Sequence, residues 1–345
     1  MVSMPYRSRR NLLFVCLAVL LLPAAARAQS VEEFYRGKTI SMVIGYPAAG
    51  ANDRYARTLA RHIGKYIPGN PHVISRNMPG SGSLLAANHV FNVAPKDGTV
   101  ISLLAATIPL EEALGTQGAK FKSAQFNWIG RMASSVNITF TNANAAVKTI
   151  KDAFTTEVIL GGTGRSGTPV VYPSVLNNVL GMKFKMVAGY SGSVAAMLAM
   201  ERGEVEGHST SVDGVKAAHP DWLLQKKINV LVQYGLRKHP GFPDVPLSIE
   251  LGRTPEEVQI LRIVANATEV GKHALTPPGV PADRVAALRR AFDLAIKDPD
   301  YIAEMNKQRL EIIPMGGEEL QKIIAEAGSI PPAILDKVKA MYPLN

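Results

Sequence analysis

Cysteine is almost absent from this sequence. The single cysteine among 345 residues, Cys16, lies in an N-terminal segment that we expect to be removed, which would leave the mature chain without a thiol. Disulfide bonds, zinc-thiolate sites and cysteine nucleophiles are thereby excluded. Long apolar runs are also missing, because the longest, residues 12–22, is shorter than the about 20 residues that a membrane helix needs.

The first 28 residues have the pattern of a secretory signal peptide. Three arginines precede the apolar run, and residues 26–28 (ARA) form an A-x-A cleavage site. We therefore predict export to the periplasm with cleavage near Ala28. The pair Arg9-Arg10 leaves the general and the twin-arginine export routes both open.

A strong excess of charge is lacking as well. The formal net charge of +10 falls to +6 when residues 1–28, with four arginines and no acid, are removed. The remaining basic residues are scattered and not interleaved with aromatic ones, which disfavours nucleic-acid binding. A mildly positive surface suits small anionic ligands.

Strand-loop-helix units recur along the chain. Residues 39–44 (TISMVI) predict a buried strand, residues 45–50 a small-residue loop, and the following residues an amphipathic helix with Asn52 or Asp53 as its N-cap. Further predicted strands are residues 72–75, 99–104, 158–160, 184–187, 205–208 and 228–233. This alternation predicts α/β architecture with mainly parallel sheets, and a mature chain of this length predicts two lobes.

Two glycine-rich segments invite catalytic or cofactor interpretations. Residues 162–167 (GTGRSG) fit the dinucleotide motif G-x-G-x-x-G, but residues 184–193 contain no acid to hold a ribose, so we reject NAD binding. Two interpretations of this segment remain, an anion site formed by backbone amides and a tight turn without a ligand. Residues 189–193 (GYSGS) resemble a nucleophile elbow without its final glycine. A serine hydrolase using Ser191 or Ser166, with His208 and Asp213 as partners, is the weaker interpretation.

Metal and ATP sites are disfavoured by similar reasoning. Glu204, Glu206 and His208 alternate along a predicted strand, a pattern more typical of a solvated strand face than of a metal site. No G-x-x-x-x-G-K-[ST] motif is present. We therefore expect no metal and no cofactor.

The whole mature chain resembles the Bug-type receptors, which are the substrate-binding proteins of tripartite tricarboxylate transporters. Residues 45–53 (GYPAAGAND) resemble the family's P-F-P-P-G-G-x-T-D, and residues 76–83 (RNMPGSGS) resemble N-R-P-G-A-G-G. Four further landmarks follow in the family's order. They are residues 94–101 (APKDGTVI), 190–206 (from YSG to GEVE), 242–247 (FPDVPL) and 277–281 (PPGVP).

The resemblance implies a two-lobed type II periplasmic binding protein fold with a hinge and an interlobe cleft. Residues 29–132 and 237–345 would form lobe one, residues 133–236 lobe two, and the hinge would lie near residues 130–134 and 234–239. Such a receptor, which we expect to be a monomer, would close around a small carboxylate and deliver it to the large and small membrane subunits of the transporter.

The resemblance also implies the ligand-binding residues, which come from both lobes. In lobe one they are Tyr46, Pro47, Ala48, Ala49, Gly50, Asn52 and Thr107. In lobe two they are Gly162, Thr163, Arg165, Ser166, Gly167, Thr168, Tyr190, Ser191, Gly192, Ser193 and Asp213.

Some residues at the expected ligand site depart from the family pattern. Arg165 replaces a usually neutral residue, so it either pairs with a second carboxylate of the ligand or lies at the cleft rim. Tyr46 and Tyr190 either flank an aromatic acid or pack against their own lobes. A sensory receptor that presents the same fold to a membrane kinase remains an alternative to transport.

Overall fold

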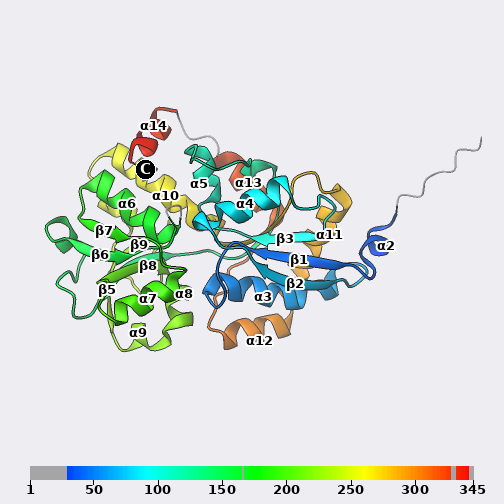
Figure 1. The fold of residues 1–345 in the computed structure, drawn as a ribbon, viewed down its shortest axis with the longest axis horizontal. Coiled ribbons are helices and arrows are strands. Elements are labelled where there is room, and N and C mark those ends of the chain that lie inside the picture. The colour runs from blue at the N-terminus through cyan, green and yellow to red at the C-terminus, as the bar shows by residue number, and fades with distance from the viewer. Residues whose placement is uncertain (1–28, 165–166, 328–331, 342–345) are drawn as a thin grey trace, which may run out of the picture.

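The computed structural model describes residues 29–164, 167–327 and 332–341, so the predicted signal peptide lies outside the described residues. Two β-sheets, each covered by helices, lie side by side and form an elongated molecule (Figure 1). Within the described residues, no helix has the length and apolar character that crossing a membrane requires. The expected two-lobed α/β fold is confirmed.

The first sheet has six strands in the order β11-β4-β10-β3-β1-β2. β1 pairs in parallel with β2 and β3, whereas β10 runs antiparallel to β3 and β4, and β11 antiparallel to β4. The strands are β1 (Thr39–Ile44), β2 (His72–Asn77), β3 (Val100–Leu103), β4 (Asn127–Ala133), β10 (Lys272–Thr276) and β11 (Met315–Gly316).

The second sheet has five strands in the order β7-β6-β8-β5-β9. β6 pairs in parallel with β7 and β8, and β5 runs antiparallel to β8 and β9. The strands are β5 (Asn137–Asn142), β6 (Val158–Gly161), β7 (Phe184–Val187), β8 (Gly207–Ser211) and β9 (Ile228–Tyr234). Both sheets are therefore mixed, which corrects the expected mainly parallel sheets, because β10 and β11 in the first sheet and β5 and β9 in the second form antiparallel pairs.

Helices cover both sheets and connect their strands (Figure 1). The α-helices are α2 (Val31–Tyr35), α3 (Ala51–Ile63), α4 (Leu84–Asn92), α5 (Ile108–Ala113), α6 (Thr168–Leu180), α7 (Ser193–Glu201), α8 (Val212–Ala218), α9 (Pro220–Leu224), α10 (Pro255–Val270), α11 (Ala282–Ala295), α12 (Pro299–Lys307), α13 (Gly317–Ala327) and α14 (Pro332–Met341). Short 3-10 helices are η1 (Gly64–Tyr66), η2 (Ser81–Ser83), η3 (Ser123–Gln125), η4 (Asp152–Phe154) and η5 (Ser248–Leu251).

The unit β1-loop-α3 forms as its residue pattern predicts. β1 spans the predicted residues, and the apolar stripe of α3 that contains Tyr55, Leu59 and Ile63 is fully buried against the first sheet. Burial of side chains of this size stabilises the fold by about 1.5–3 kcal/mol each. This packing holds the loop between β1 and α3 at the carboxyl edge of the sheet.

Strand β8 differs from its prediction. The alternation of residues 205–208 suggested a strand, but β8 covers Gly207–Ser211, and Glu204 and Glu206 precede it. All of β8 is buried although it consists of Gly, His, Ser and Thr, so apolar periodicity does not locate it. The Glu206 carboxylate accepts the N–H of Ile159 at 2.8 Å, and the three residues that were considered as metal ligands therefore share no strand face.

The chain crosses between the two sheets at two neighbouring places. The first crossing lies between the end of β4 at Ala133 and the start of β5 at Asn137, beside the predicted residues 130–134. The return crossing lies at Gly271, between α10 and β10. A Cβ added to Gly271 would lie 2.1 Å from the carbonyl oxygen of Ala133, so the two crossings touch.

The family resemblance places the second hinge segment near residues 234–239, directly after β9. After β9 the chain stays with the second sheet, because Leu247 bridges to Gln233 and α10 packs in the same buried cluster as α6. Helix α14 joins this cluster through Val338, whereas α13 contacts β4 of the first sheet. Which residues move together as a lobe stays a prediction.

Candidate functional site

The loop after β1 supplies the first group of predicted ligand residues. Tyr46, Pro47 and Gly50 are half-buried, Ala48 and Ala49 are exposed, and Ala49 has a positive φ of 72°. Gly50 is the N-cap of α3, which corrects the expected Asn52 or Asp53. Asn52, in the first turn of α3, is half-buried.

Asp53 fixes this loop from inside α3. Its buried carboxylate accepts the N–H of Ala49 at 2.9 Å, the side-chain amide of Asn77 at 2.8 Å and the guanidinium of Arg57 at 2.9 Å. Asn77 in turn donates to the carbonyl oxygen of Tyr46 at 2.8 Å. Asp53 is thus a positioning residue for the loop, whereas the sequence pattern assigned Asp53 only to the start of the helix.

Two loops of the second sheet supply the other predicted residues. The loop from Gly162 to Thr168 lies between β6 and α6, and the loop from Tyr190 to Ser193 lies between β7 and α7. Backbone hydrogen bonds join them, because the amides of Gly189 and Tyr190 donate to the carbonyl oxygens of Thr163 and Gly162, both at 3.2 Å. Arg165 and Ser166 lie outside the described residues.

The loops of the two sheets meet each other. A Cβ added to Gly192 would lie 2.8 Å from Cγ of Pro47, and one added to Gly164 would lie 2.9 Å from the backbone nitrogen of Gly82. The φ of Gly192 is 177°, a conformation open to any residue. Gly192 is therefore constrained by the close approach of Pro47 and not by its own backbone.

Three of the helices that begin at these loops have no side chain bonded to their N-terminal amides. The N-caps of α3, α6 and α7 are Gly50, Gly167 and Gly192, and none makes a side-chain cap hydrogen bond. Of the other helices, α2, α8, α10 and α12 are capped by the side chains of Ser30, Ser211, Thr254 and Asp298, whereas α4, α5, α9 and α11 also lack a side-chain cap. Uncapped N-terminal amides at the positive end of a helix dipole favour an anion.

Asp213 lies at the start of α8, beside the loops. It is 3% exposed, and its Oδ2 is 3.0 Å from the hydroxyl of Tyr55 on α3, while its Oδ1 has no hydrogen-bond partner among the described residues. Burial raises the pKa of Asp213, and burial lowers the pKa of nearby Lys272 to about 8. Asp213 thus joins elements of both sheets.

Two predicted residues have local structural partners. Ser193 lies 3.2 Å from the hydroxyl of Thr210, Oγ to Oγ1, and Thr107 is buried as the N-cap of α5. Tyr190 is half-buried and Ser191 exposed.

Tyr172 on α6 is a candidate that the sequence pattern missed. Its hydroxyl is buried and has no hydrogen-bond partner among the described residues. Burial raises its pKa, and Tyr46 of the other sheet adds to this effect. The ring of Tyr172 stacks on Tyr234 in the buried cluster of the second sheet. A buried hydroxyl without a partner suits a ligand contact.

His208 and Asp213 of the hydrolase interpretation have other partners. The Nδ1 of His208 lies 2.6 Å from the carbonyl oxygen of Gly161, and burial lowers the pKa of His208 to about 4. Asp213 faces Tyr55, as described above. Among the described residues, no group of three or more His, Cys, Asp or Glu could hold a metal ion.

Known structures share this architecture. BugD, a periplasmic binding protein, superposes with a TM-score of 0.70 at 19% identity, over 89% of this chain and 98% of its own. MatC from Rhodopseudomonas palustris with bound malate gives 0.67 at 19% identity, over 88% of this chain and 99% of its own. An R. palustris protein with adipate superposes with a TM-score of 0.67 at 15% identity, over 88% of this chain and 97% of its own.

Sequence comparisons agree with the resemblance found in the motifs. The chain is 26% identical over 324 residues to a UPF0065 protein in the gbd 5'region of Cupriavidus necator. The aligned residues cover 91% of this chain and 92% of that protein. The family model of the tripartite tricarboxylate transporter family receptor matches residues 55–339. The chain therefore belongs to the tripartite tricarboxylate transporter receptor family, whose members are periplasmic substrate-binding proteins.

Proposed function

We propose that this receptor captures a small carboxylate between its two groups of loops and delivers it to the membrane subunits of a tripartite tricarboxylate transporter. The observation that supports this most directly concerns the N-termini of α3, α6 and α7, which lie at loops that meet each other. Each has glycine as its N-cap residue and therefore no side-chain cap. A carboxylate would accept hydrogen bonds from these amides, and each charge-assisted bond contributes about 1.5–3 kcal/mol.

The helix N-terminal amides and the solved relatives both support a carboxylate as the ligand. Solved relatives contain malate and adipate, both of which carry carboxylates. We propose that the residues predicted from both lobes line the cleft, that Tyr172 adds a hydroxyl, and that the lobes rotate about the crossings beside Ala133 and Gly271. The mature receptor would begin after Ala28 and act as a monomer in the periplasm.

A thermal-shift screen of residues 29–345 tests this function. Mono-, di-, tri- and aromatic carboxylates are compared with amino acids and sugars. A ligand at 100 times its dissociation constant adds about 2.7 kcal/mol of stability, so one carboxylate class should raise the melting temperature clearly. A shift with neutral sugars and none with carboxylates would contradict the proposal.

A further inference from the structure

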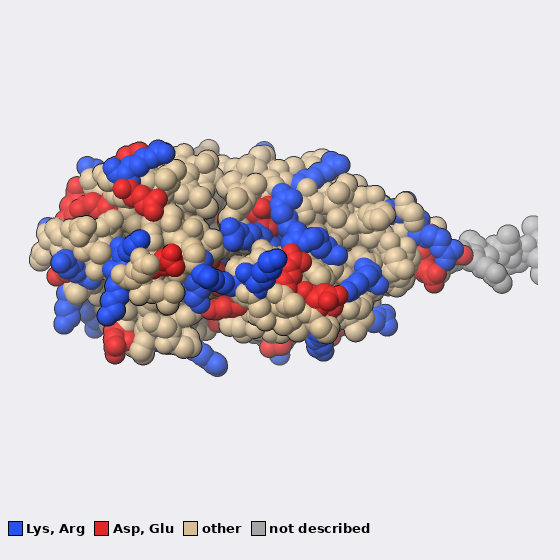
Figure 2. All heavy atoms as spheres, turned by 90° about the horizontal axis from the view of Figure 1, so that it is seen from below, with Lys and Arg blue, Asp and Glu red and all other residues tan. Residues whose placement is uncertain are grey.

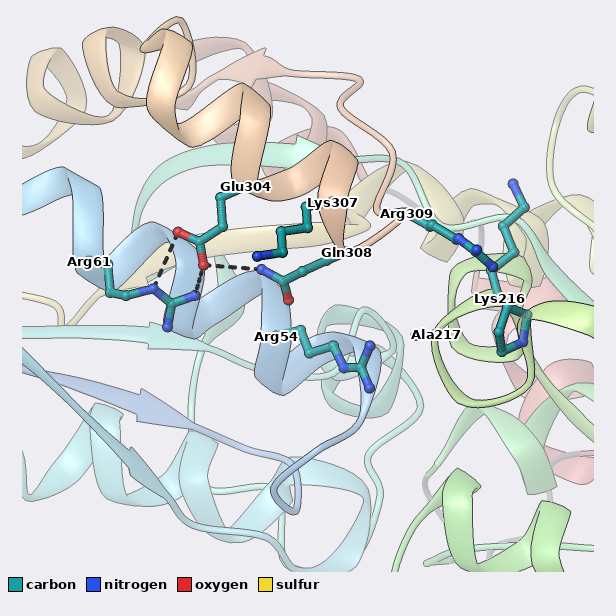
Figure 3. Close-up of a pocket in the computed structure, with 9 residues that line it drawn as sticks. Arg54, Arg61, Lys216, Ala217, Glu304, Lys307, Gln308 and Arg309 are labelled. Carbon is teal, nitrogen blue, oxygen red and sulfur yellow. Dashed lines mark hydrogen bonds and ion pairs between the residues drawn. The ribbon is translucent and has the colours of Figure 1, made fainter.

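A basic pocket is lined by residues of α3, α8, α9 and α12 and of the segment that follows α12. It has a volume of about 610 Å³ and shares no residue with the ligand-binding set predicted above. Its lining residues are Arg54, Arg61, Lys216, Ala217, Pro220, Glu304, Lys307, Gln308 and Arg309. Figure 3 shows Arg54 and Arg61 on α3 and Glu304 on α12, with Lys216 opposite them on α8.

Most of the charge in this pocket is positive and uncompensated. The lining contains five cationic side chains and one carboxylate, Glu304. That carboxylate is already occupied, because Arg61 pairs with it, His62 contacts it at 2.9 Å and Gln308 donates to it at 3.2 Å. The pocket therefore has no internal anion to offset its other cations.

Three of the cations form no ion pair within the described ranges. Lys216 pairs with Glu311 at 2.9 Å, but Arg54, Lys307 and Arg309 have no acidic partner there. The face seen in Figure 2 shows Lys and Arg side chains gathered over the middle of the molecule. Like charges that converge on one hollow repel each other, and a bound anion would relieve this repulsion.

The chemistry of the lining selects the kind of anion. Only Ala217 and Pro220 offer apolar side chains, so a ligand with a large carbon skeleton would find little to pack against. Arginine presents a planar fork that pairs bidentately with phosphate oxygens, and lysine adds a mobile point charge. We propose that this pocket binds a compact, free, multivalent oxyanion of the phosphate class.

The position of the pocket links anion binding to the arrangement of the lobes. α3 and α12 pack with the first sheet, whereas Val212 and Val215 of α8 pack in the buried cluster of β5 on the second sheet. Among the lining residues Lys216 is the cation that α8 contributes, so an anion that contacts Lys216 as well as the cations of α3 and α12 would favour the arrangement in which these helices face each other. The pocket would thus be a second anion site, separate from the carboxylate cleft.

Calorimetric titration of residues 29–345 with inorganic pyrophosphate at low ionic strength tests the proposal. The double variant Lys307→Gln/Arg309→Asn removes two exposed, unpaired cations, and asparagine tolerates the positive φ of 58° at position 309. We expect it to weaken pyrophosphate binding at least tenfold. The matched control Lys148→Gln/Lys151→Gln removes two exposed lysines elsewhere and should bind like the wild type.

Three results would overturn the proposal. They are no binding by the wild-type protein, equal affinity of the wild type and Lys307→Gln/Arg309→Asn, or an equal loss in the control, which would indicate unspecific charge attraction. Sedimentation with phosphatidylglycerol vesicles distinguishes the source of the phosphate. Binding to vesicles without binding of pyrophosphate would assign the pocket to a membrane surface and would contradict a free anion.

Discussion

The hydroxyl of Tyr55 lies 3.0 Å from Oδ2 of Asp213 and 2.8 Å from the carbonyl oxygen of Glu311. A hydroxyl has one proton, and a carbonyl oxygen can only accept, so Tyr55 cannot donate fully to both. If Asp213 is protonated, it can donate to the Tyr55 hydroxyl while that hydroxyl donates to the carbonyl oxygen of Glu311. The raised pKa of Asp213 favours the protonated form. The contact joins residues 158 positions apart and connects α3 to α8.

Removing this hydroxyl should destabilise the protein. We expect Tyr55→Phe to lower the free energy of unfolding by about 1–3 kcal/mol, because it removes the hydrogen-bond partner of both the Asp213 carboxyl group and the carbonyl oxygen of Glu311. Tyr301→Phe is the matched control, since Tyr301 is equally buried and its hydroxyl has no hydrogen-bond partner among the described residues. Urea unfolding of both variants measures the difference. Equal losses would show that the Tyr55 contact contributes nothing.

Lys272 should make stability depend on pH above neutrality. Burial holds its pKa at about 8, below the ordinary 10.5, so between these values the unfolded chain binds more protons than the folded one. Stability contributed by this group therefore rises with pH across that window, by about 3 kcal/mol. Relative to Lys272→Met, the wild type should gain stability from pH 8 to 10.5 in urea unfolding. A constant difference would contradict a buried lysine, and the exposed Lys148→Met should parallel the wild type.

Gly192→Ala tests whether the loops must meet to hold a ligand. The added methyl group would collide with Pro47, and overpacking of this kind costs about 1–3 kcal/mol. We expect roughly tenfold weaker carboxylate binding. Gly316→Ala, whose Cβ meets nothing within 4 Å, is the control and should bind normally. Unchanged affinity of Gly192→Ala, measured by calorimetry, would mean that ligand binding does not bring these loops together.

Asp53→Asn tests the support of the loop after β1. The substitution keeps the size of the side chain but weakens its bonds to the N–H of Ala49 and to Arg57, so we expect about tenfold weaker ligand binding. Asp152→Asn is matched, because Asp152 also accepts backbone amides, from Lys148 and Thr149, but away from the site. Both variants should lose stability, and only Asp53→Asn should lose affinity. Equal affinities would assign Asp53 to stability alone.

Arg165→Ala tests the second charge of the ligand. If Arg165 pairs with a distal carboxylate, its removal should weaken binding of a dicarboxylate by about 10–100-fold, the equivalent of one charge-assisted bond. Binding of the monocarboxylate of the same chain length should not change. Titration of both acids compares the two effects. Unchanged affinity for every dicarboxylate would place Arg165 at the cleft rim.

Local patterns predicted much of the fold and less of the site. β1 and α3 follow from apolar periodicity and from the loop between them, and the family motifs identified the receptor. The polar strand β8 gave no periodic signal, because its hydroxyl and imidazole groups are buried by the sheet around them. Glycine replaced the expected side-chain cap of α3, since Asp53 bonds to the preceding loop instead. The approach of Tyr55 to Asp213 depends on tertiary packing alone.

If the lobes rotate as proposed above, Gly271 and Ala133 would set the geometry of the opening. These two crossing segments touch, and a side chain at position 271 would push them apart, so they would form one shared pivot. A single pivot permits rotation and resists sliding of one sheet past the other. The ligand loops of the two sheets would then face each other in the same alignment each time the cleft closes. The length of the ligand would set the angle at which closure stops, so the receptor would discriminate ligands by their length.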